Sequence, residues 1–219
     1  MNRFKTNAKK FILASAFAAT AATLVACASG ISGMPNASTG WAIDGAQSSL
    51  NFVTTKAGQA GVGGIGEVQS FKRFTGGMDS AGQIKLVIDL ASVDTGVEIR
   101  DERLRTMLWN IKATPQATFS AKLSANDLAK LSIDTASDID VAGQLELAGQ
   151  TKPVNAKLRA TRLSGGQIMV TTRAPIIVNS NDYGLKAGVE AMREVMNLNF
   201  LASTAPVSFS LVLKAQDKG

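Results

Sequence analysis

The chain has 219 residues, of which 45% are hydrophobic and 18% charged, and it contains one cysteine and no histidine. This length and composition are typical of one soluble globular domain with a short additional segment. Without histidine, Ser-His-Asp and Cys-His nucleophilic pairs are excluded, as are most zinc and non-haem iron sites. A single cysteine also excludes an intrachain disulfide and any CxxC motif. The net charge of +6 would fit a nucleic-acid partner only if the basic residues belong to the folded part.

The first 26 residues have the pattern of a secretory signal peptide. Residues 1–10 carry four basic side chains and no acidic one, and residues 11–26 form an uncharged, alanine-rich stretch. Sixteen apolar residues are fewer than the roughly 20 that a spanning helix needs, so a membrane anchor helix is the weaker interpretation. Removal of this signal leaves 19 basic and 17 acidic side chains, a net charge of +2. We therefore expect no nucleic-acid partner.

Residues 24–27 (LVAC) resemble the lipobox that ends bacterial lipoprotein signals. In such signals the cysteine is acylated and becomes the mature N-terminus, which predicts lipidation at Cys27; a buried free cysteine is the alternative. Ala28 favours the outer membrane, by resemblance to lipoprotein sorting signals. Residues 27–40, rich in small and polar residues, would form a flexible tether to a domain of residues 41–219. These features predict a periplasmic protein held at a membrane by its lipid.

From Leu50 onward, apolar and polar residues alternate, which is typical of strands with one apolar and one wet face. Turn signals, including Gly76-Gly77 with Asp79, separate several of these strands. The predicted strands lie near residues 49–54, 68–75, 83–93, 117–123, 139–148, 153–163, 167–178 and 205–214. Eight antiparallel strands favour an all-β closed barrel, because closure removes exposed edges and leaves room for one small ligand.

Two segments have helical spacing instead. Thr95 and Glu98 fit a capping box, and apolar residues follow at helical spacing: Val97, Leu104, Leu108 and Ile111. The charged residues 101–103 and Arg105 would supply the polar face of a helix lying over the barrel. Residues 186–196 predict a second short helix, with Val189, Met192 and Met196 near one face.

Several spaced segments resemble the YceI-like family of lipocalin-like barrels. They are residues 41–44 (WAID) with 48–52 (SSLNF), 91–96 (ASVDTG) with 100–105 (RDERLR), 114–119 (TPQATF), 143–154 (GQLELAGQTKPV) and 182–185 (DYGL). The resemblance covers about residues 41–214 and implies a secreted barrel that binds a long apolar molecule, such as a polyisoprenoid or a fatty amide. Members commonly carry histidine where this chain has Gln47 and Glu102. Any role of those imidazoles in head-group contacts or pH response therefore does not carry over.

The inward rows of the strands supply the candidate ligand-binding residues. They are Phe52, Phe71, Leu86, Ile88, Phe119, Leu145 and Phe209, with Met107 and Trp109 near the mouth. The alternative is that these side chains fill a solid core. Arg100, Asp101 and Arg105 could meet a polar head at the rim, although charges on a helix usually form its solvated face.

Three further patterns have simpler interpretations. Residues 61–66 match G-x-G-x-x-G, but the following residues are strand-like, and a nucleotide site needs a helix there. Asp134, Asp138 and Asp140 could ligate calcium, yet they lack the glycine and glutamate of an EF-hand, so a polar hairpin is the better interpretation. Glu190 and Glu194, at i and i+4, fit a helix surface better than a catalytic acid pair.

The resemblance to YceI-like proteins implies binding, sequestration or transport of a long-chain apolar ligand, and the signal-like N-terminus places this in the bacterial periplasm; we expect no catalysis, cofactor or metal. Apolar walls suffice for this, since burying a chain contributes about 0.8 kcal/mol per CH₂. The alternative is a non-catalytic accessory interaction module of a membrane redox or stress-response system, with a solid barrel. An enzyme acting on the lipid would depend on Asp, Glu, Lys or Tyr183, and no paired cluster suggests one. The sequence leaves both a monomer and a homodimer open.

Overall fold

The computed structural model describes residues 40–58, 63–124, 127 and 135–216. The predicted signal peptide, Cys27 and all of the predicted tether except Gly40 lie outside these residues. No helix within the described ranges has the length and apolar character needed to cross a membrane.

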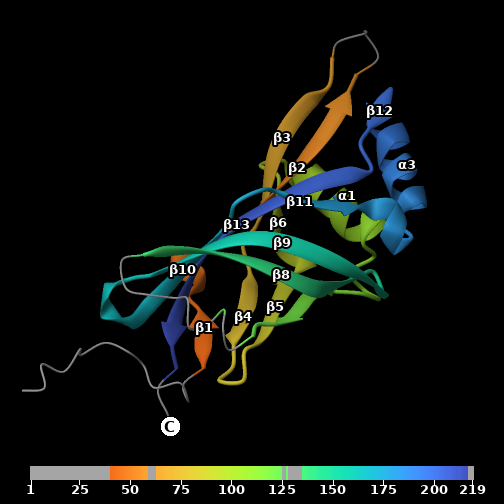
Figure 1. Cartoon of the computed structure of the whole chain (residues 1–219). Coiled ribbons are helices and arrows are strands. Elements are labelled where there is room, and N and C mark those ends of the chain that lie inside the picture. The colour runs from red at the N-terminus through yellow and green to blue at the C-terminus, as the bar shows by residue number, and fades with distance from the viewer. Residues whose placement is uncertain (1–39, 59–62, 125–126, 128–134, 217–219) are drawn as a thin grey trace, which may run out of the picture. The chain divides into compact units, whose positions relative to one another are not determined.

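Thirteen strand segments form one antiparallel sheet that closes on itself (Figure 1). They are β1 (Trp41–Ile43), β2 (Ser49–Ala57), β3 (Ile65–Phe71), β4 (Phe74–Met78), β5 (Gln83–Asp89), β6 (Val93–Asp94), β7 (Gln116–Lys122), β8 (Ala136–Leu147), β9 (Gln150–Arg162), β10 (Gln167–Thr172), β11 (Ile176–Asn179), β12 (Phe200–Leu201) and β13 (Thr204–Ala215). Their order along the sheet is β1-β4-β5-β7-β8-β9-β10-β13-β2-β3-β6, and β1 closes the ring by pairing with both β4 and β13.

Four of the barrel strands are interrupted near their middle. β1 continues into β2, β3 into β4, β5 into β6 and β10 into β11, with a short 3-10 turn or a bend between the two segments of each pair. Counted this way, the sheet is a closed barrel of eight strands, with the short β12 added beside β2. The predicted all-β, eight-stranded antiparallel barrel is confirmed.

The strand register places the predicted apolar rows on the inside. Leu86 of β5 lies opposite Phe119 of β7, which in turn lies opposite Leu145 of β8. Because side chains alternate between the two faces, every second residue along each strand shares this inner layer. Around β1, the interior is packed by Trp41 and Ile168 among others, and the opposite end has its own buried cluster.

Gly76 and Gly77 lie within β4, so the prediction that they form a turn is wrong. Gly76 has φ 139°, and a Cβ there would overlap the carbonyl oxygen of Lys85 on β5. A Cβ on Gly77 would overlap the carbonyl oxygen of Trp41 on β1. The two glycines thus let the neighbouring backbones approach β4 closely from both sides. The turn itself follows at Asp79, whose Oδ1 accepts the Gln83 N–H at 2.8 Å.

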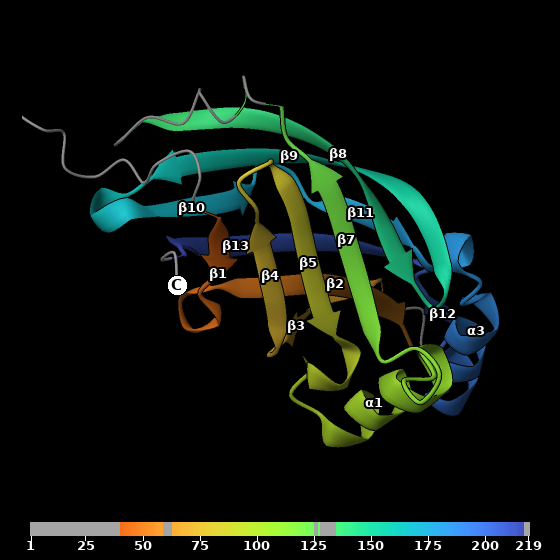
Figure 2. The same cartoon turned by 90° about the horizontal axis from the view of Figure 1, so that it is seen from below.

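Helices α1 (Glu98–Arg103) and α3 (Lys186–Val195) lie together at the end of the barrel away from β1 (Figure 2). α1 continues into a π-helical turn, η3 (Leu104–Leu108). α3 packs closely on this turn, because a Cβ at Gly188 would lie 2.7 Å from the Met107 carbonyl oxygen. The two predicted helical segments are therefore confirmed, although the first changes from an α-helix to a π-helix after Arg103.

The predicted capping box at the start of α1 is wrong. The helix begins after Val97, which makes no side-chain cap. Asp101, rather than Glu98, reaches back and accepts the Thr95 N–H at 2.9 Å. Asp101 is buried by this contact, so it does not belong to the solvated face of the helix as expected. A carboxylate in the first turn also suits the positive end of the helix dipole.

Candidate ligand-binding cavity

The barrel encloses an apolar cavity of about 290 Å³. On β8 its lining row runs from Ile139 to Leu147. The eight steps from Ile139 to Leu147 cover about 26 Å of strand, or about 20 Å along the axis of a barrel whose strands tilt by roughly 40°. The interior is therefore hollow, contrary to the alternative of a solid core.

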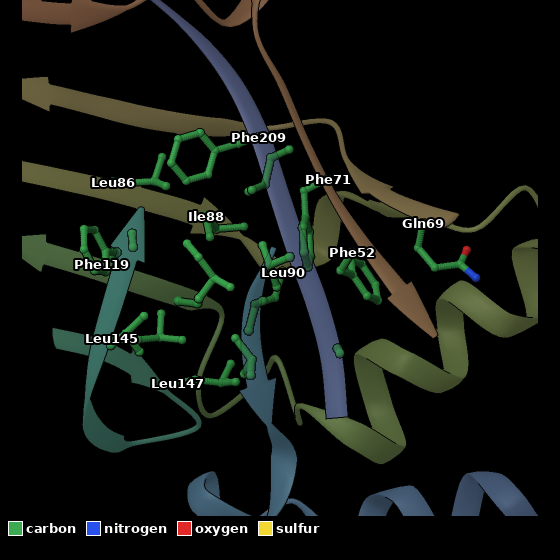
Figure 3. A pocket seen from close by; sticks show the side chains of 18 of the residues that line it. Phe52, Gln69, Phe71, Leu86, Ile88, Leu90, Phe119, Leu145, Leu147 and Phe209 are labelled. Carbon is green, nitrogen blue, oxygen red and sulfur yellow. The ribbon is translucent and has the colours of Figure 1, made fainter. Parts of the chain in front are cut away.

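All of the predicted ligand-binding residues except Met107 line this cavity. Figure 3 shows Phe52, Phe71, Leu86, Ile88, Phe119, Leu145 and Phe209 around it, and Trp109 lines it as well. Met107 is 36% exposed and is absent from the lining, where its neighbour Leu108 takes part instead. The apolar helical spacing includes Leu108 rather than Met107, so the lining by Leu104 and Leu108 agrees with that spacing. Contact between these side chains and a ligand stays a prediction.

Three aromatic rings form a collar near the helix end of the cavity. Phe52 stacks on Phe71 with ring centroids 5.2 Å apart, and Phe71 lies 5.6 Å from Trp109. Phe52 and Trp109 meet edge to face at 6.4 Å. Such aromatic pairs stabilise each other beyond their buried area, so the three rings support one another in this part of the wall.

Beyond this collar the lining becomes polar, which the sequence reasoning missed. Gln69 and Thr54 come first, with Gln69 Nε2 donating to Thr54 Oγ1 at 3.2 Å. A signal was present in the sequence, because Gln69 shares the period-two row of Phe71 on β3. The cavity wall is thus apolar along most of its length and polar at one end.

Charged side chains form the outermost layer, and we call Lys56, Glu67 and Arg100 the mouth of the cavity. Glu67 Oε2 lies 2.9 Å from Lys56 Nζ and 3.0 Å from Arg100 Nη1. The other two charges predicted at the rim serve the protein itself: Asp101 binds the Thr95 N–H, and Arg105 donates to the Ala91 carbonyl oxygen at 3.0 Å. Of the three charged residues predicted for the rim, only Arg100 lines the cavity.

Comparison with known proteins shows which family this barrel belongs to. The family model of the YceI-like domain matches residues 41–213. The chain belongs to the YceI-like family. A polyisoprenoid binding domain from Saccharophagus degradans, implicated in plant cell wall breakdown, is 33% identical, with a TM-score of 0.74, over 80% of this chain and 98% of that one. Burkholderia cenocepacia BcnA shares the fold at 19% identity and a TM-score of 0.53, over 78% of this chain and 98% of that one. No curated protein matches the chain.

The positions where YceI-like proteins commonly carry histidine lie outside the cavity lining in this member. Gln47 Nε2 donates to Asp44 Oδ2 at 2.7 Å on the protein surface. The hydrogen bond from Lys214, followed by that from Gln47, lowers the pKa of Asp44 to about 2. Glu102 is exposed and pairs with Arg105 at 3.7 Å. In this chain, neither residue is placed to contact a ligand inside the barrel.

The glycine-rich segment of this YceI-like chain leads into a strand. Gly63 and Gly64 precede β3, which begins at Ile65, so the helix that a G-x-G-x-x-G nucleotide site requires does not follow. Gly61 and Val62 lie outside the described residues. The interpretation of the segment as a loop before a strand therefore holds for its described part.

Three of the remaining acidic candidates, Asp138, Glu190 and Glu194, are held in ion pairs, and Asp140 is exposed on β8. Asp138 pairs with Arg159 at 2.9 Å and with Arg173 at 3.2 Å across the outer face of the sheet. Glu190 and Glu194 both pair with Arg193. Asp134 lies outside the described residues, and within the described ranges no group of three His, Cys, Asp or Glu residues could hold a metal ion.

Tyr183, the remaining candidate acid or base, is buried among the helix-end cluster. Burial raises the pKa of its hydroxyl, and the neighbouring charge of Asp182 raises it further. The hydroxyl is therefore held protonated at neutral pH, whereas a general base needs a lowered pKa.

Proposed function

We propose that this YceI-like protein binds a long-chain apolar ligand, a polyisoprenoid or a fatty amide, and carries or sequesters it in the bacterial periplasm. The observation that supports this most directly is the apolar cavity of about 290 Å³ that follows the barrel axis. Each buried CH₂ contributes about 0.8 kcal/mol, so such a wall retains a chain without any covalent step. The relative from Saccharophagus degradans, described as a polyisoprenoid binding domain, supports the same ligand class.

The test is to recover the ligand. The full-length protein, expressed in a bacterial host, is examined by native mass spectrometry and then extracted with organic solvent. We expect a bound mass of one long-chain lipid per protein, identified in the extract. Empty protein that also takes up no isoprenoid or fatty-amide probe would overturn the proposal.

A matched pair of variants separates cavity binding from surface adsorption. Ala156 is buried on the inner face of β9, and Asn155 beside it is exposed on the outer face. Ala156→Phe should block the lumen and abolish lipid recovery, whereas Asn155→Phe should leave recovery intact. Equal recovery from both variants would place the lipid elsewhere on the protein.

The proposed location depends on the lipid anchor at Cys27. Two or more acyl chains hold a protein at a membrane stably, whereas one gives only reversible binding. We expect the chain to incorporate labelled palmitate and to sediment with outer-membrane vesicles, and Cys27→Ala to abolish the labelling. A wild-type chain that stays unlabelled would refute the anchor while leaving the binding function untouched.

A further inference from the structure

Gln69 is a buried polar side chain in a largely apolar cavity. It is 1% exposed, and in the register of β2 and β3 it lies directly opposite Phe52. Its Nε2 donates to Thr54 Oγ1, but its Oε1 is buried with no hydrogen-bond partner among the described residues. Buried amide oxygens in native proteins are nearly always hydrogen-bonded, because an unpaired one loses the bonds it made to water. This oxygen is therefore a site where a partner is expected.

The position of Gln69 matches the end of a chain lying in the barrel. Figure 3 shows its amide at the far end of the lining from Phe119, next to the rings of Phe52 and Phe71. The opposite end of the cavity is lined by Met78, Ile168 and Leu213, which offer no hydrogen bond. The unpartnered amide oxygen of Gln69 therefore favours a polar head at this end of the cavity, with the tail pointing towards β1.

We propose that the Gln69 amide oxygen is the head-group subsite of the cavity, and that it accepts a hydrogen bond from a neutral donor head, a hydroxyl or a primary amide. This inference rests on the proposed function and specifies the ligand class. An anionic head fits less well, because it has no proton to donate to a carbonyl oxygen. The two nearby cations, Lys56 and Arg100, are both already engaged by Glu67 Oε2 at the mouth.

The test compares three probes of the same isoprenoid chain on the delipidated full-length protein. Geranylgeraniol carries a hydroxyl donor, its methyl ether only an acceptor, and the parent hydrocarbon neither. We expect the alcohol to bind about tenfold more tightly than the ether or the hydrocarbon, since one neutral hydrogen bond in a dry site changes affinity by about this factor. Geranylgeranoic acid at neutral pH, the anionic probe, should bind more weakly than the alcohol.

The variants assign the preference to Gln69. Gln69→Met keeps the length of the side chain and removes the amide, so the alcohol should lose its tenfold advantage and bind like the ether. Gln144→Met makes the same change at an exposed position on the outer face of β8 and should retain the preference. Gln69→Leu serves as a second variant, and circular dichroism checks that each variant is folded.

The possible results separate the subsite from the function it rests on. Equal binding of alcohol and ether by the wild-type protein would overturn the subsite while leaving chain binding intact. So would a preference for the ether or the acid, or an alcohol preference that survives Gln69→Met. If none of the four probes binds, and a long-chain fatty amide does not bind either, the proposed function itself fails, and the subsite fails with it.

Discussion

Replacing Gly143 by alanine should push the Phe119 ring into the lumen. Gly143 lies on the inner face of β8, opposite Ala121 of β7. A Cβ there would lie 2.5 Å from Phe119 Cε2 and 2.7 Å from the Ser120 carbonyl oxygen, whereas carbon atoms in contact are about 3.5–4.0 Å apart. The ring must therefore move away from β8 by about 1 Å, and because Phe119 lines the cavity we expect it to move into the lumen. Overpacking of this kind costs about 1–3 kcal/mol of unfolding free energy.

Two measurements check this reasoning, urea unfolding and uptake of probes of increasing chain length. Gly58→Ala is the matched control, because a Cβ there meets nothing within 4 Å. Gly143→Ala should lower the unfolding free energy and shorten the longest chain accepted, and Gly58→Ala should do neither. Adding Phe119→Leu to Gly143→Ala should restore part of the unfolding free energy and part of the chain length accepted. Such a non-additive effect is typical of residues in contact. Identical unfolding free energy and probe uptake in the two alanine variants would refute the idea that the missing side chain at Gly143 makes room for the Phe119 ring.

Three further changes test other parts of the molecule. The pKa of Asp44 is lowered from 3.8 to about 2, mainly by the hydrogen bond from Lys214. The ionised carboxylate therefore stabilises the folded protein above pH 4, and this stabilisation is lost as the pH falls towards 2. In Asp44→Asn the free energy of unfolding should depend less steeply on pH between about 4 and about 2 than in the wild type. The same pH dependence in both proteins would contradict the lowered pKa. Leu90 is 2% exposed, and Leu90→Ala should lower the free energy of unfolding, measured in urea, by about 2–5 kcal/mol. A loss below about 1 kcal/mol would show that Leu90 is loosely packed. Glu67→Gln removes the ion pairs that join Lys56 and Arg100 across the mouth, so bound probe should leave several-fold faster at low salt only, as measured by stopped-flow fluorescence. Release rates equal to wild type would show that these ion pairs do not slow the exit of the probe.

The strands and the interior rows were predictable from the sequence because both depend on a local property. Side chains in a strand alternate with period two, so Ile84, Leu86 and Ile88 identify their common face without knowledge of any partner strand. Closure followed from the number of strands, since an eight-stranded sheet is more stable without edges. The cavity was less predictable, because the same rows are compatible with a solid or a hollow interior.

The errors concern the contacts of individual side chains, which local patterns do not decide. Met107 was assigned to the mouth of the cavity from its place after the predicted helix, but it is exposed and its neighbour Leu108 lines the cavity instead. Glu98 fitted a local capping pattern, but Asp101 makes the contact. Gln69 shares the period-two row of Phe71, so its inward orientation could be inferred from the sequence, whereas its unpartnered oxygen among the described residues could not. Whether a polar side chain inside a barrel finds a hydrogen-bond partner depends on the tertiary structure.

The hollow interior also couples the stability of this protein to what it contains. A ligand that binds only the folded barrel raises the unfolding free energy by RT ln(1 + [L]/Kd), which is about 2.7 kcal/mol at a hundredfold excess over Kd. Two preparations of the same chain, one loaded in the host and one extracted, would then melt at different temperatures. The melting temperature of an untreated sample would report the lipid acquired during expression as much as the amino-acid sequence.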